Sequence, residues 1–178
     1  NINEYNHWLR YSKQKSNKLT KEEIEHDMYN LIPAAGLGSR FSDYGYEIPK
    51  PLIEVSGNKM LVSTAKSLPK ANENIFILHK NHIRDYSLDK IILNELENSS
   101  VVECHQNTDG MAITCLLAEN YLKNKNKSIL VSSCDYSIEY DREEFFYIIE
   151  RDKPDACIWT FSNYPDARLS PNAYAYLK

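Results

Sequence analysis

Short apolar runs alternate along the chain with segments in which apolar residues recur every three or four positions. The runs carry few polar residues on either face, which is typical of strands buried inside a sheet. The periodic segments are typical of amphipathic helices. The pattern predicts strands over residues 29–35, 74–79, 100–105, 128–133 and 156–161, a short extended segment over 51–55, and helices over 60–68, 88–96, 111–122 and 142–150.

This alternation predicts an α/β fold. Strands that are apolar on both faces need cover on both faces, so the pattern favours a mainly parallel, Rossmann-like sheet flanked by helices in three layers, α/β/α. Sheets of this kind bind ligands beyond the carboxyl ends of their strands. We therefore expect functional groups in the loops after residues 35, 105 and 133.

The first 28 residues differ in character from the rest of the chain. They are polar and charged, and Thr20 and Glu23 form a capping box typical of a helix start. We expect residues 1–28 to be a helical extension or linker and residues 29–178 to form the main domain. The chain begins with Asn1 and its last strand-like run stops in mid-pattern. We therefore expect part of a longer, multidomain protein, with the C-terminal portion of the main domain lacking.

The composition of the 178 residues is that of a globular domain, with 42% hydrophobic and 26% charged residues. A net charge of −4 argues against a broad nucleic-acid-binding surface and leaves room for a pocket that binds a small anion. The apolar runs are too short for a membrane span or a signal peptide.

The four cysteines, widely spaced among apolar neighbours, predict buried reduced thiols. We expect a cytoplasmic protein.

The loop after the first predicted strand has the composition of an anion-binding turn. Small residues there allow backbone N–H groups to approach phosphate oxygens closely. Arg40 adds a guanidinium that suits the same oxygens, and Lys50 follows as a point charge held between two prolines. The small residues of this loop are Ala34, Ala35, Gly36, Gly38 and Ser39.

Three other glycine motifs do not match this loop. A P-loop needs a Lys-Ser or Lys-Thr pair after the glycines, and none is present. A dinucleotide fingerprint needs a third small residue where Phe41 stands, and a nucleophile elbow needs a G-x-S-x-G sequence. An ordinary glycine-rich turn between a strand and a helix is the remaining alternative.

Two later loops carry further candidates, each with a plain structural alternative. Gly110 can expose backbone amide and carbonyl groups to a nucleobase, and Gln106 can add a side-chain amide. Asp109 could instead simply cap the next helix. Asp135 ends a buried strand and is placed to hold Mg²⁺, or it caps the turn that follows.

Residues 31–41, 49–55 and 57–60 together resemble the signature of the nucleoside-triphosphate transferase family, the sugar-phosphate nucleotidylyltransferases. The signature there is GxGxR followed by PKP and Leu or Met. The form found here is similar to members from bacterial surface-polysaccharide gene sets. The resemblance extends from Tyr29 to the end of the chain and implies a GT-A-like version of the predicted fold.

This resemblance implies an enzyme that couples a nucleoside triphosphate to a phosphorylated sugar, polyol or small alcohol and releases pyrophosphate. A pyrimidine nucleotide (CTP, dTTP or UTP) is favoured, and the product would serve surface-polysaccharide synthesis. Arg40 and Lys50 would be the catalytic residues, and Asp135 would hold Mg²⁺. The glycine loop would bind the triphosphate, and Gln106, Asp109 and Gly110 the base. Relatives usually carry a second metal-binding acid beyond the point where this chain ends.

Two other readings remain open. A non-catalytic nucleotide-binding or assembly module could share the fold. A GT-A-type glycosyltransferase could share the sheet topology, but the Asp-x-Asp pair of those enzymes is missing where Asp135 is followed two positions later by Ser137.

Overall fold

The computed structural model describes residues 26–38, 41 and 45–160. The predicted capping box at Thr20 and the last apolar run lie outside these residues. The chain divides into two compact units, Asn1–Tyr140 and Asp141–Lys178. No helix in the described part of the chain is both long and apolar enough to cross a membrane.

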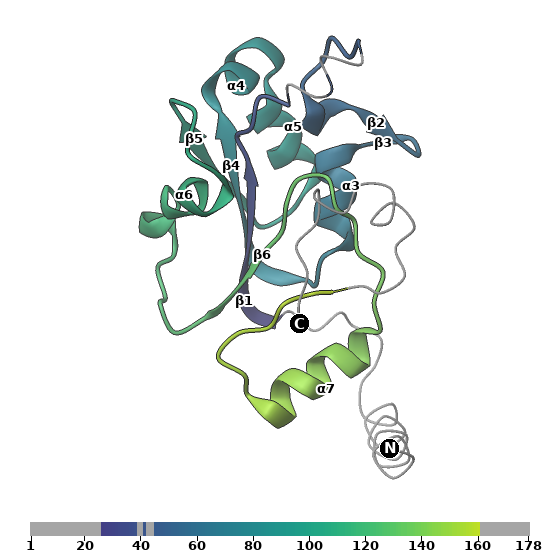
Figure 1. The fold of residues 1–178 in the computed structure, drawn as a ribbon, viewed down its shortest axis with the longest axis vertical. Coiled ribbons are helices and arrows are strands. Elements are labelled where there is room, and N and C mark those ends of the chain that lie inside the picture. Colours follow the sequence, from purple (N-terminus) through teal and green to yellow (C-terminus); the bar gives the residue numbers. More distant parts are fainter. Residues whose placement is uncertain (1–25, 39–40, 42–44, 161–178) are drawn as a thin grey trace. The chain divides into compact units, whose positions relative to one another are not determined.

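A four-stranded sheet in which every neighbouring pair is parallel forms the centre of the first unit (Figure 1). The chain moves outward from β1 through β4 to β5, and then returns to the opposite side of β1 as β6. This reversal creates a topological switch point between β1 and β6, where parallel sheets bind ligands. The predicted Rossmann-like parallel sheet is confirmed. Its strands, in spatial order, are β5 (Ser99–Cys104), β4 (Ala71–His79), β1 (His26–Ala34) and β6 (Ser128–Val131).

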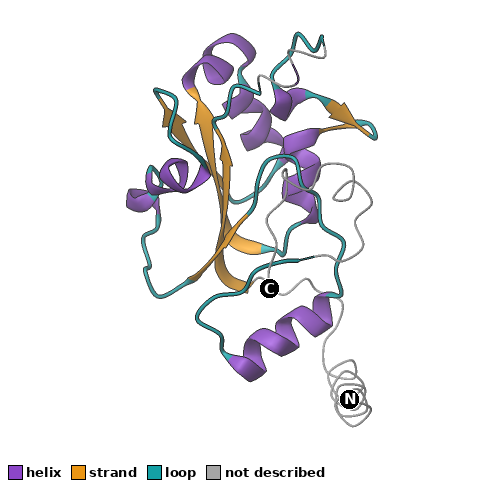
Figure 2. Ribbon diagram, in the orientation of Figure 1, coloured by secondary structure: helices purple, strands orange, loops and turns teal. Residues whose placement is uncertain are grey.

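Alternate side chains of the strands face two separate hydrophobic clusters. Ile32 and Phe76 point into the cluster built with α3 (Met60–Ser67) and α5 (Leu88–Glu95). Leu31 and its neighbours face the opposite cluster, beside α6 (Met111–Leu116). Figure 2 shows α3 and α5 on one side of the sheet and α6 on the other, which confirms the three layers. Burial of each large apolar side chain contributes roughly 1.5–3 kcal/mol.

The segment between β1 and α3 is more structured than the extended stretch predicted over 51–55. It contains the 3-10 turn η1 (Lys50–Leu52) and a small antiparallel hairpin. The hairpin turns at Ser56 and Gly57, whose φ angles of 52° and 80° match the tight turns that suit strand twist. The hairpin strands are β2 (Glu54–Val55) and β3 (Asn58–Lys59).

Two helical predictions need correction in this unit. The structure adds α4 (Lys80–Tyr86), which was not predicted because it is short and mostly polar and shows little apolar period. The helix predicted over 111–122 ends at Leu116, and a separate 3-10 turn, η2 (Glu119–Tyr121), follows it.

The second unit contains α7 (Arg142–Asp152), which confirms the helix predicted over 142–150. Its first turn is capped by Asp141, whose carboxylate accepts a hydrogen bond of 2.9 Å from the Glu144 amide. The strand predicted over 156–161 was wrong for its described residues, because 156–160 are exposed and form no strand. An apolar run becomes a strand only where another strand edge pairs with it.

The cysteines are free thiols with unequal burial. Cys104 is buried as predicted, and Cys115 and Cys134 are partly buried. The prediction of burial was wrong for Cys157, which is exposed because its segment does not enter the sheet.

Candidate functional site

The loops that follow β1 and β6 lie on either side of the switch point. β1 ends at Ala34, and Ala35 continues it as a buried residue before the chain reaches Gly36. On the other side, the Ser132 amide donates a hydrogen bond of 3.1 Å to the Leu31 carbonyl, which keeps the two strand ends together. Parallel pairing thus brings the glycine loop and the Asp135 loop to the same edge of the sheet.

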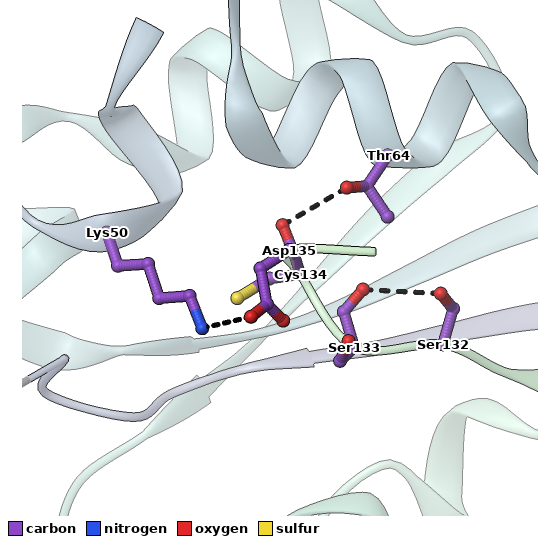
Figure 3. Close-up of polar contacts among 6 residues, drawn as sticks. All are labelled: Lys50, Thr64, Ser132, Ser133, Cys134 and Asp135. Carbon is purple, nitrogen blue, oxygen red and sulfur yellow. Dashed lines mark hydrogen bonds and ion pairs between the residues drawn. The ribbon is translucent and has the colours of Figure 1, made fainter. Parts of the chain in front are cut away.

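An ion pair joins the candidate lysine to the candidate metal-binding acid at this edge. The Lys50 Nζ donates to Asp135 Oδ2 at 2.5 Å (Figure 3). The two side chains are 21% and 25% exposed, so both charges are largely withdrawn from water but still reachable by a ligand. A positive and a negative group at the carboxyl ends of the strands can hold both phosphate oxygens and a cation.

Helix α3 positions the Asp135 loop through two side-chain hydrogen bonds. The buried Thr64 hydroxyl donates a hydrogen bond of 3.2 Å to the Cys134 carbonyl (Figure 3). One turn later, the Ser67 hydroxyl accepts a hydrogen bond of 3.0 Å from the Ile138 amide. These two contacts fix the backbone on both sides of Asp135. Thr64 and Ser67 were not predicted as supporting residues, because nothing in the pattern of a helix shows which loop it will support.

Gly38 lets the glycine loop lie directly against Lys50. Its φ of +68° belongs to the left-handed region that favours glycine. A Cβ at this position would lie 3.1 Å from the Lys50 Cβ, which is tighter than ordinary van der Waals contact. By contrast, a Cβ at Gly36 would meet nothing within 4 Å. Gly38 is therefore required both by its backbone conformation and by the close approach of Lys50.

Cys134 packs as a neutral thiol beside the ion pair. Burial raises the pKa of the Cys134 thiol to about 11, with Asp135 adding to the rise and Lys50 opposing it. Cys134 is an unsuitable ligand for Mg²⁺, because this ion prefers oxygen ligands.

The loop after β5 holds the residues predicted to contact the base. Gln106, Asp109 and Gly110 are exposed, and their strand is separated from β1 by β4. Gly110 is the N-cap residue of α6 and has a φ of +103°. The alternative in which Asp109 caps this helix is therefore wrong. The buried Thr114 hydroxyl, 3.1 Å from the Gly110 carbonyl, holds the turn in place and was also missed by the sequence analysis.

The structure thus brings together Gly38, Lys50 and Asp135 and leaves the base loop two strands away at the same edge. Ala34 and Ala35 are buried at the point where the glycine loop leaves β1. The predicted residues Ser39 and Arg40 lie outside the described residues.

The donor set suits a cation that is shared with a substrate. In the described part of the chain, no group of three or more His, Cys, Asp or Glu side chains is placed to hold a metal. Mg²⁺ in phosphate-transfer sites is usually held by one or two carboxylates together with substrate phosphates. Asp135 fits that arrangement and would be the protein ligand.

A parallel sheet with a glycine turn, a lysine and an acid at its switch point is an arrangement that can bind phosphate groups. The chain belongs to the nucleotidyl transferase family, whose model matches residues 29–176. It is 28% identical over 119 residues to mannose-1-phosphate guanyltransferase 2 of Candida glabrata, covering 66% of this chain and 33% of that protein. It is 29% identical over 94 residues to the bifunctional protein GlmU of Methanococcus aeolicus, covering 52% of this chain and 21% of that protein.

Two solved structures support the fold. One is a putative glucose-1-phosphate thymidylyltransferase from Bacillus anthracis, with a TM-score of 0.54, 20% identity, and coverage of 71% of this chain and 51% of that one. The other is the inositol-1-phosphate CTP transferase from T. maritima, with a TM-score of 0.51, 20% identity, and coverage of 63% and 45%. The chain spans a third or less of the length of the two curated relatives.

Proposed function

We propose that this chain carries the nucleotide-binding and catalytic half-site of a sugar-phosphate nucleotidyltransferase. The observation that supports the proposal best is the contact of Lys50 with Asp135 beside the Gly38 turn, at the switch point of a parallel sheet. Family membership supplies the reaction class. The chemistry needs two anions, a triphosphate and a phosphorylated acceptor, to be held together, and this site supplies the positive and negative groups to do so.

In the proposed reaction, an oxygen of the acceptor phosphate attacks the α-phosphorus of the nucleoside triphosphate. The new P–O bond forms as the bond to the β-phosphate breaks, and pyrophosphate leaves. The protein contributes mainly positioning and charge stabilisation. Lys50 would contact both the α-phosphate and the acceptor phosphate, and thereby reduce their mutual repulsion. Backbone amides around Gly36 and Gly38 would bind the triphosphate.

Arg40 is proposed to stabilise the charge that develops on the α-phosphate and on the departing pyrophosphate. Asp135 is proposed to hold Mg²⁺. When bound, Mg²⁺ would supply neutralisation of the triphosphate charge. Lys50 and Asp135 would then no longer neutralise each other, because each would have a substrate partner.

The finer parts of the proposal concern the substrates. We propose that Gln106, Asp109 and Gly110 contact the base, and that the base is a pyrimidine. The relatives differ on this point, since their names include guanyltransferases, a CTP transferase and a thymidylyltransferase. The role in surface-polysaccharide synthesis rests on the sequence resemblance alone.

A pyrophosphate-release screen tests the reaction. Five nucleoside triphosphates (CTP, UTP, dTTP, ATP and GTP) would be paired with phosphorylated sugars, polyols and aminoalcohols in the presence of Mg²⁺. We expect release from one pair, with kcat lower by on the order of 10²–10³ in Lys50→Ala and in Asp135→Asn.

The matched controls are Lys66→Ala and Glu139→Gln, which remove an exposed lysine and an exposed acid and should leave the rate unchanged. Full activity in Lys50→Ala would contradict the assigned role of the lysine. No release from any pair, while a triphosphate still raises the melting temperature, would identify a non-catalytic binding module instead.

A further inference from the structure

The Lys50 ammonium has a second partner besides Asp135. Its Nζ lies over the ring of Phe41, 5.3 Å from the ring centre. An ammonium at this distance is attracted by the negative face of the ring, and the attraction is stronger where water is partly excluded. Lys50 is only 21% exposed and Phe41 is partly buried, so this condition is met.

The Phe41 ring is itself held in place by its neighbours. The Phe41 amide donates a hydrogen bond of 2.8 Å to the Gly38 carbonyl, and its own carbonyl accepts one of 3.1 Å from the Tyr46 amide. The Tyr46 ring packs edge-on against the Phe41 ring, with centres 5.6 Å apart. Phe41 thus presents one face of its ring to the lysine, and Tyr46 packs against the same ring.

The two partners of the ammonium differ in what a substrate does to them. Asp135 is the carboxylate proposed to hold the metal, so substrate binding would take it away from Lys50. The Phe41 ring carries no group that a metal or a phosphate would bind, and therefore it stays available. Among the described residues, it is the partner that can hold the ammonium both before and after Asp135 is engaged.

We propose that Phe41 is a positioning residue that holds the Lys50 ammonium over its ring, so that the amine is in place for phosphate when Asp135 is occupied. The catalytic consequence of this inference rests on the proposed function. The contact between the Phe41 ring and the Lys50 ammonium rests on the observed geometry alone. In the sequence, Phe41 serves only to exclude a dinucleotide fingerprint.

The contact can be tested without activity by NMR of protein labelled at lysine Cε. Protons over an aromatic ring are displaced upfield. We expect the Lys50 Hε signal to lie upfield, to return to the ordinary lysine position in Phe41→Leu, and to stay upfield in Phe41→Tyr. In Asp135→Asn it should also stay upfield, because the ring alone then holds the amine.

Two other lysines serve as internal references. Lys127 lies over the Tyr29 ring at 5.6 Å and should also be upfield in every variant. Lys59 pairs with Glu95 at 2.9 Å and should remain at the ordinary position. A Lys50 signal that does not move in Phe41→Leu, or that loses its displacement in Asp135→Asn, would overturn the proposal.

The kinetic arm measures whether the contact matters for turnover. For Phe41→Leu we expect kcat/KM to fall about 2- to 5-fold, mostly through KM for the nucleotide, with rescue by Phe41→Tyr. Stepwise fluorination of the Phe41 ring, which weakens its negative face but keeps its shape, should reduce kcat/KM stepwise. Phe146→Leu, which removes a ring that faces Arg142 at 6.0 Å, is the matched control.

Unchanged kcat/KM across the Phe41 series would overturn the positioning role even if the NMR displacement were present. If the wild-type chain releases no pyrophosphate with any substrate pair, the proposed function fails. The NMR arm then still decides whether the ring holds the lysine.

Discussion

Lys50 Nζ and Asp135 Oδ2 lie 2.5 Å apart although 85 positions separate the two residues in the chain. In the structure, the two charges neutralise each other at the carboxyl edge of the sheet. In the proposed reaction, each charge has a different partner, phosphate for the amine and Mg²⁺ for the carboxylate. The amine and the cation therefore compete for Asp135 until a nucleotide draws the amine away.

This competition predicts that Lys50→Ala binds a divalent cation more tightly than the wild type when no nucleotide is present. Removing an ion pair worth up to about 1 kcal/mol should strengthen Mn²⁺ binding by about 2- to 5-fold. Free Mn²⁺ can be measured by electron paramagnetic resonance. Lys66→Ala should bind Mn²⁺ as the wild type does, and Asp135→Asn should bind it less tightly. Equal affinity in Lys50→Ala and the wild type would show that the pair does not oppose the metal.

Substituting Gly38 and Gly36 in turn tests whether the backbone conformation requires glycine at position 38. Gly38→Ala should lower the free energy of unfolding by about 1–2 kcal/mol, because it forces an L-residue to a φ of +68° and pushes against the Lys50 Cβ. Gly36→Ala meets open space and should change stability little or raise it slightly. Urea unfolding of both variants provides the measurement. Equal effects of the two substitutions would contradict the assigned requirement at Gly38.

Because His82 is buried, we expect the folded protein to lose stability in mild acid. Burial, together with the neighbouring His79, lowers the pKa of His82 below its ordinary value of about 6.5, while Asp85 opposes this. The Nδ1 atom of His82 is buried and has no hydrogen-bond partner among the described residues, and the two imidazole rings are 5.5 Å apart. As the pH falls below about 6.5, the unfolded chain takes up a proton at this position that the folded chain resists. The free energy of unfolding should therefore fall by no more than about 1.4 kcal/mol per pH unit from this group.

Urea unfolding at pH 7.5 and 5.5 measures the effect. His82→Leu should reduce the difference between the two pH values, because the group that takes up the proton is gone. His105→Gln, at an exposed histidine, should leave the difference as in the wild type. The explanation fails if His82→Leu and the wild type lose the same stability in acid.

The thiols should react with alkylating reagents in an order set by burial and charge. Cys134, with a pKa near 11, and Cys115, whose pKa is also raised by burial, stay protonated at pH 8 and should react slowly. Cys157 is exposed and should react first. Peptide mapping after brief iodoacetamide treatment gives the order. Rapid labelling of Cys134 in the folded protein would indicate that its thiol is not buried beside the Lys50–Asp135 pair as described.

The sequence predicted the sheet strands well because their apolar runs are long enough to be recognised without tertiary context. The runs at 29–35, 74–79, 100–105 and 128–133 each became a strand of the parallel sheet, with shifted ends. The run at 156–161 has a similar composition, yet residues 156–160 form no strand. An apolar pattern indicates that a segment can be buried. To form a strand, the segment also needs hydrogen bonds to a neighbouring strand.

The short elements could not be predicted for a related reason. α4 and the hairpin of β2 and β3 contain few apolar residues, and their local propensities are weak. Their stability comes from tertiary packing against the rest of the fold. The contacts of Thr64 and Phe41 were not predicted either. Thr64 contacts Cys134, which lies far away along the chain, and nothing in the sequence indicates that the Phe41 ring lies against Lys50.

The amino-acid sequence by itself determined the alternation of strands and helices, and it named the glycine loop, Lys50 and Asp135 as candidates for binding phosphate and metal. Only the tertiary structure decided that β6 returns to the side of β1 opposite β4. That strand order brings Asp135 to Lys50, and the left-handed turn at Gly38 brings the glycine loop against Lys50. The physical reason is that periodicity reports which face of an element is buried, whereas strand order depends on which edges pair once the whole core is assembled.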